Sequence, residues 1–69
     1  MRHQVMAYTA GATLLMGTIE STTAREALNV ALQCDTSELE CVELSAGSCE
    51  KREMFSGEQG PVFVVKQLH

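Results

Sequence analysis

The sequence predicts one small α+β domain in which a single α-helix packs on one face of a small antiparallel sheet, in the order β-β-α-β-β-β. Three observations predict this fold: a hairpin pattern near the N-terminus, a helix-capping pattern after it, and three strand-like segments in the second half. A chain of 69 residues is too short for a second hydrophobic core. Residues 1–69 are therefore expected to form a single compact domain.

The first two strands form the predicted hairpin. Residues 4–9 and 13–20 are rich in apolar and β-branched types, and Gly11 between them can adopt the positive φ that a tight turn requires. Strict alternation along the second strand places Leu15 and Ile19 on one face, and Leu14 and Met16 on the other. Both faces of this strand are therefore expected to be apolar.

A capping box predicts where the helix begins. Thr23 and Glu26 stand three residues apart, so each side chain can accept a hydrogen bond from the backbone N–H of the other. The apolar residues that follow form a broad stripe, and Val30 lies well to one side of it. This breadth predicts that the helix contacts more than one flat sheet.

Three strands are predicted in the second half of the chain. Residues 38–46 favour a strand, although Ser37 and Glu40 form a second capping pattern that is typical of a helix start. Residues 49–56 alternate weakly around a charged centre, which predicts an exposed or edge strand. The last strand opens at Pro61, and residues 62–65 are apolar on both faces, which predicts a central or doubly covered position.

The sequence contains no pattern that indicates a metal, cofactor or catalytic site. Zinc-ligand spacings are absent, and His3 and His69 stand at the chain ends, where fraying is usual. Cys34, Cys41 and Cys49 lack the cationic or helix N-terminal neighbour that activates a thiol. We therefore expect no enzyme activity, no metal and no cofactor.

Charge and cysteine content narrow the remaining functional classes and the expected cellular compartment. Five basic residues against nine acidic ones give a net charge of −4, which disfavours nucleic-acid binding because that binding neutralises phosphates. An odd number of cysteines, three, is typical of reduced thiols in the cytoplasm rather than of a secreted disulfide framework. No apolar run approaches the roughly 20 residues that span a bilayer, so no membrane association is expected.

Apolar side chains exceed what one helix can cover, which predicts a homodimer or a protein partner. The candidate partner-binding residues are an acidic strip and two residues of the second strand: Asp35, Glu38, Glu40, Glu43, Met16 and Leu14. The alternative is a nucleic-acid-binding regulator, with four basic candidates: Arg25, Lys51, Arg52 and Lys66. A small enzyme or enzyme subunit is the second alternative.

The expected function is a non-enzymatic protein-interaction module that inhibits or regulates a larger cytosolic complex. Small acidic proteins of mobile elements that inhibit restriction or CRISPR complexes are similar to this chain in size and charge. No motif in the sequence adds to that analogy.

Overall fold

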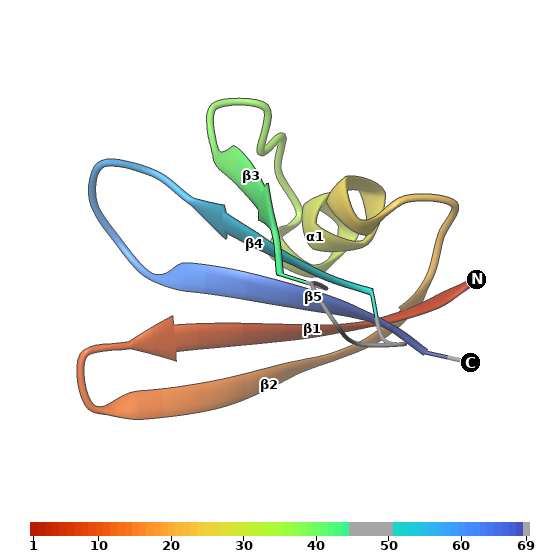
Figure 1. The fold of residues 1–69 in the computed structure, drawn as a ribbon, viewed down its shortest axis with the longest axis horizontal. Coiled ribbons are helices and arrows are strands. Elements are labelled where there is room, and N and C mark those ends of the chain that lie inside the picture. The colour runs from red at the N-terminus through yellow and green to blue at the C-terminus, as the bar shows by residue number, and fades with distance from the viewer. Residues whose placement is uncertain (45–50, 69) are drawn as a thin grey trace.

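The predicted α+β architecture and element order are confirmed in a computed structural model, which describes residues 1–44 and 51–68. Figure 1 shows the six elements: β1 (Arg2–Thr9), β2 (Ala12–Glu20), α1 (Ala24–Leu32), β3 (Glu40–Glu43), β4 (Arg52–Ser56) and β5 (Val62–Leu68). The second capping pattern, at Ser37 and Glu40, starts no helix, because Glu40 begins β3. Parts of the strands predicted over residues 38–46 and 49–56 lie outside the described residues.

The five strands form one antiparallel sheet in the order β2-β1-β5-β4-β3. The central position predicted for the last strand is confirmed, since β5 lies between β1 and β4. The edge position predicted for β4 is wrong. Residues Glu40–Glu43 of β3 pair with β4 and take that edge, so β2 and β3 are the two edge strands.

The N-terminus of α1 forms where the capping pattern predicts it. Thr23 is extended, and its side-chain oxygen accepts a hydrogen bond from the Glu26 N–H at 3.1 Å. The Glu26 carboxylate reaches one residue further back than predicted and accepts the Thr22 N–H at 3.3 Å. Thr22, Thr23 and Glu26 thus stabilise the first turn of the helix together.

The helix ends at Gln33, which adopts the left-handed conformation with φ 56° and ψ 37°. The Gln33 N–H donates to the Val30 carbonyl at 3.3 Å, and the Cys34 N–H donates to the Asn29 carbonyl at 3.2 Å. These bonds satisfy carbonyls that the end of a helix leaves without partners. A left-handed residue at this position is usually glycine, because a Cβ atom is unfavourable there.

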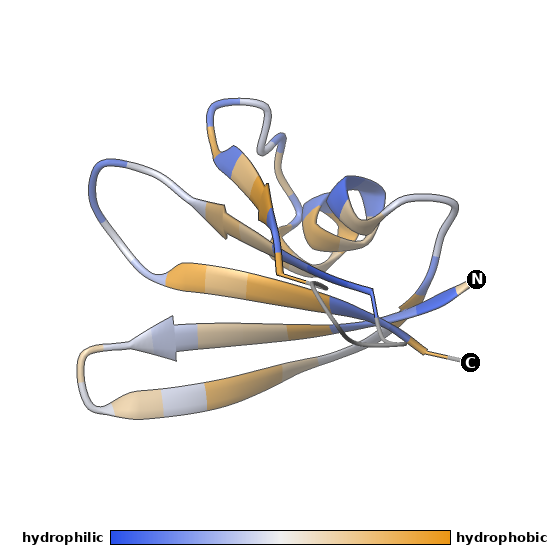
Figure 2. Ribbon diagram, viewed as in Figure 1, coloured by the Kyte–Doolittle hydropathy of each residue, from blue (hydrophilic) through white to orange (hydrophobic). Residues whose placement is uncertain are grey.

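The hydrophobic core lies between α1 and one face of the sheet. Val5 and Val65 are paired across β1 and β5 and are fully buried. The other buried apolar residues are Ala7, Ala24, Ala27, Leu28, Phe55 and Phe63. Figure 2 shows apolar stretches along β2 and β5 and mixed hydropathy around α1. Two of the three buried residues of α1 are alanines, Ala24 and Ala27, so the helix packs close to the strands.

The segment between α1 and β3 is fastened to the helix by polar side chains. The Arg25 guanidinium donates to the Thr36 carbonyl and, at 3.0 Å, to the Leu39 carbonyl. Asn29 Oδ1 accepts the Thr36 N–H at 3.0 Å, and the Thr36 side chain is buried. These bonds fix the path along which the chain enters β3.

Candidate functional site

The sheet face opposite α1 carries a continuous row of apolar side chains. Directly paired residues of neighbouring strands point to the same face, so the register identifies the row. It takes one residue from each strand, and we call it the apolar row: Leu15, Met6, Val64, Met54 and Val42. Its outer members, Leu15 and Val42, are 62% and 47% exposed, and its middle members are half-buried. None of them belongs to the buried core between the sheet and the helix.

Charged residues flank the apolar row on both sides. Tyr8 and Val62 pair with each other beside the row, and Glu40 lies on the same side at the β3 edge. Arg52 and Lys66 pair with each other on the opposite side. The open face, as we call this surface, is therefore apolar along its centre, acidic at one flank and basic at the other.

A β-bulge changes which residues of β2 join this face. The register shifts between Val5 and Met6, so Val5 lies opposite Gly17 while Met6 lies opposite Leu15. Gly17 adopts φ 133°, which side chains other than glycine rarely tolerate. Met16 is the additional residue of the bulge.

The bulge makes the predicted faces of Leu14 and Leu15 wrong. Leu14 pairs with Ala7 on the helix side of the sheet, and Leu15 takes the place on the open face. Both residues are more than half exposed, because β2 is an edge strand. Leu14 and Met16 stay predicted partner-binding residues, but Leu14 does not share a surface with the apolar row.

The four acidic candidates are divided among different surfaces. Glu40 points to the open face, whereas Glu43, three residues later, pairs with Glu53 on the helix side. Asp35 accepts hydrogen bonds from the Ser37 N–H at 2.9 Å and the Ser37 hydroxyl at 3.2 Å, so it stabilises the turn after the helix. Glu38 is exposed in the segment before β3. Only Glu40 of this set lies beside the apolar row.

The four basic candidates are also dispersed. Arg25 is half-buried and bonded to the carbonyls that precede β3. Lys51 lines a hollow on the helix side, while Arg52 and Lys66 lie on the open face. Of these four residues, only Arg52 and Lys66 are paired side by side.

A hollow of about 220 Å³ lies at the N-terminus of α1. Its polar wall includes His3, Thr22, Thr23, Glu53 and Gln67. The expectation that His3 lies in a frayed terminus is wrong, because His3 belongs to β1 and is 3% exposed. His69 lies outside the described residues. Among residues 1–44 and 51–68, no cluster of three or more acidic, histidine or cysteine side chains has the arrangement of a metal site.

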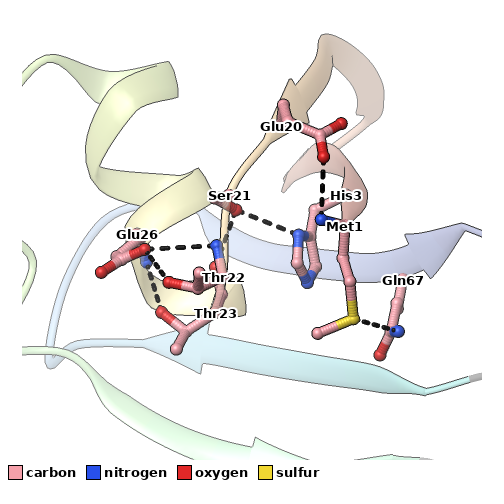
Figure 3. Close-up of polar contacts among 8 residues, drawn as sticks. All are labelled: Met1, His3, Glu20, Ser21, Thr22, Thr23, Glu26 and Gln67. Carbon is pink, nitrogen blue, oxygen red and sulfur yellow. Dashed lines mark hydrogen bonds and ion pairs between the residues drawn. The ribbon is translucent and has the colours of Figure 1, made fainter.

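His3 and Ser21 form a hydrogen bond of 3.0 Å beside this hollow, as Figure 3 shows. The Ser21 hydroxyl donates its proton to the Thr23 carbonyl at 2.9 Å. Since that hydroxyl has one proton, His3 Nδ1–H must be the donor to Ser21 Oγ. A histidine that activates a serine nucleophile accepts the serine proton instead. This pair therefore joins the end of β2 to β1 and lacks the arrangement of a catalytic dyad.

The thiols give no sign of activation in the described part of the chain. Partial desolvation and the nearby Glu53 carboxylate raise the pKa of Cys41, which disfavours its thiolate. Cys34 is exposed and carries no disulfide, and Cys49 lies outside the described residues.

Among residues 1–44 and 51–68, the fold is an α+β arrangement in which α1 covers one face of the sheet and no described element covers the other. Comparison with protein-family models, curated proteins and solved structures found no match. Within the described residues, no helix is both long and apolar enough to cross a membrane.

Proposed function

We propose that this protein is a non-enzymatic protein-interaction module and that the open face is its binding surface. The observation that carries the proposal is the apolar row, which crosses all five strands on the face that α1 does not cover. Burying apolar surface is favourable by about 25 cal/mol per Å². A small domain with one covered sheet face gains most by covering the other in an assembly.

The proposed occupant of the open face is a second copy of the chain. The face carries both signs of charge, with Glu40 at one flank and Arg52 at the other, so it is complementary to itself. A second antiparallel sheet packed on the first makes a sandwich about 10 Å thick, a common way to bury sheet faces. The dimer is thus the structural unit of the proposed module.

The wider proposal is that this module inhibits or regulates a larger cytosolic assembly. It is supported by the small size of the chain and by its net charge of −4, which favours encounter with basic surfaces. Regulation is a proposal about what the dimer binds, and the open face is a proposal about how the dimer forms.

Two matched valine substitutions test the open face. Val42 lies on it at the β3 edge, and Val30 lies on the helix; they are 47% and 59% exposed. Sedimentation equilibrium of the wild type should give twice the 7.5 kDa mass of one chain. V42K should shift the dimer to monomer while V30K leaves it intact, and circular dichroism should show both variants folded.

Two results would overturn the proposal. If the wild type stays monomeric at the highest soluble concentration, a second copy does not bind the open face. A dimer that V30K disrupts and V42K does not would place the interface on the helix instead.

A further inference from the structure

The positions of charge on the open face restrict how two copies can stack. Glu40 and Val42 are two residues apart on β3, and Arg52 and Met54 are two residues apart on β4. Both charged side chains therefore lie on the face of the apolar row. Glu40 pairs with Ser56, four residues from Arg52 on β4. The acidic and basic flanks are therefore separated by about 14 Å along the strands, at 3.4 Å per residue.

Two sheets that pack face to face in a symmetric dimer are related by a two-fold axis lying between them. If that axis runs along the strands, each flank of the face meets the same flank of the other copy. Lys66 belongs to the central strand, so it would then lie over the Lys66 of the other copy. Like charges brought together in this way oppose association.

If the axis runs across the strands, the flanks are exchanged. The apolar row then lies over the apolar row, and the flank with Arg52 lies over the flank with Glu40. Lys66 meets the flank that contains Val62, because both belong to β5. This arrangement buries the apolar centre and places opposite charges at two symmetric positions.

Resting on the proposed function, we propose that two copies stack through the open face about an axis across the strands, with Arg52 of each copy facing Glu40 of the other. Sheets packed in this way are about 10 Å apart. In the untwisted arrangement the two charged positions are offset by one strand, about 4.8 Å. Long Arg and Glu side chains can extend across this separation, so Arg52 and Glu40 set the orientation of the dimer.

The size of the face indicates how strong the dimer should be. Five strands at about 4.8 Å spacing and three rows of side chains cover about 24 by 20 Å. The two copies together therefore bury on the order of 1,000 Å², at the lower limit for specific interfaces. A weak dimer of this kind is sensitive to two ion pairs, which makes charge reversal a decisive test.

The test is a charge-reversal cycle measured by sedimentation equilibrium. E40R and R52E should each weaken the dimer roughly ten-fold, because each places like charges at both symmetric contacts. The double variant E40R/R52E should recover most of the wild-type affinity, since it restores opposite charges in exchanged positions. E58R is the matched control, because Glu58 is exposed in the turn between β4 and β5 and belongs to no strand of the face.

The net charges of the variants make the result specific. E40R and E58R lower the net negative charge equally, so general repulsion between two acidic chains falls equally in both. Weakening by E40R but not by E58R therefore reports a local contact. The double variant has the net charge of the wild type.

Each outcome decides one proposal. If the wild type is a dimer that V42K disrupts, but the double variant stays as weak as the single ones, the axis across the strands is wrong and the open face stands. If the wild type is a monomer, the proposed function itself fails.

Discussion

The Arg25 guanidinium lies over the Phe55 ring, 5.0 Å from its centroid, and so joins the helix to an interior strand of the sheet. The same guanidinium bonds to the carbonyls of Thr36 and Leu39. One side chain thereby holds three parts of the fold: α1, β4 and the segment that leads into β3. Its role in this structure is to position the β3 edge of the open face.

Replacing Arg25 by lysine should destabilise the protein. R25K keeps the positive charge but cannot bond to both carbonyls in the planar geometry of a guanidinium while lying on the ring. We expect the free energy of unfolding to fall by about 1 to 3 kcal/mol. Urea unfolding followed by circular dichroism measures the loss.

The control for this prediction is R2K, because Arg2 is exposed on β1. R2K should change the free energy of unfolding by less than about 0.5 kcal/mol. Both variants are compared at one protein concentration, since dimerisation contributes to apparent stability. Equal effects of R25K and R2K would show that the contacts of Arg25 add nothing to stability.

Glycine at position 33 should stabilise the helix end. Gln33 has φ 56°, where a side chain is disfavoured and glycine is not. We expect Q33G to raise the free energy of unfolding by about 0.5 to 1 kcal/mol, and Q33A to give no such gain. Thermal unfolding of the two variants checks this, and a lower midpoint for Q33G would contradict it.

Alanine at position 17 should be destabilising for a backbone reason alone. Gly17 has φ 133°, and a Cβ atom built there meets no atom within 4 Å. We expect G17A to lower the free energy of unfolding by about 1 kcal/mol or more. A synthetic chain with D-alanine at position 17 is the control, because D-residues favour positive φ. If L- and D-alanine destabilise equally, strain at the bulge is not the cause.

The hydrogen bonds between Thr22 and Glu26 should be detectable as a lowered pKa of the Glu26 carboxyl. Hydrogen bonds from Thr22 lower the pKa of the Glu26 carboxyl. A carboxyl whose pKa is depressed by folding stabilises the folded state above its unfolded pKa, and this contribution disappears as the pH falls through the folded pKa. In an NMR titration the Glu26 pKa should lie below the ordinary glutamate value, and T22V should raise it. An unchanged Glu26 pKa in T22V would assign the shift to another group.

Local patterns predict those parts of the fold that depend on neighbouring residues. The pair Thr23 and Glu26 is enough to predict the helix start, because a capping interaction extends over three residues. Residues 62–65 predict a central or doubly covered strand, because they are apolar on both faces. The position of β4 could not be predicted in the same way. It depends on pairing with β3, and the charged residues of β4 are equally compatible with an interior strand whose ends are exposed.

The candidate site was predictable in part. Alternation separates Met6 and Val64 from Val5 and Val65, and the register shows the two pairs on opposite faces of the sheet. The exchange of Leu14 and Leu15 could not be read from the sequence, because a strand glycine such as Gly17 is compatible with a bulge or with regular pairing. Val42 was not predicted as a site residue. The spacing of two residues between Val42 and Leu44, which is typical of one face of a strand, was the signal that could have identified it.

The pairing of the first strand with the last has a consequence for how the protein is made. β5 is the central strand, and it is also the last of the five to leave the ribosome. Until it emerges, the β1–β2 hairpin and the β3–β4 pair have no strand to join them, and their apolar faces stay in water. The sheet therefore forms late, through contacts distant in sequence that close slowly. We therefore expect the nascent chain to be prone to aggregation until β5 has been synthesised.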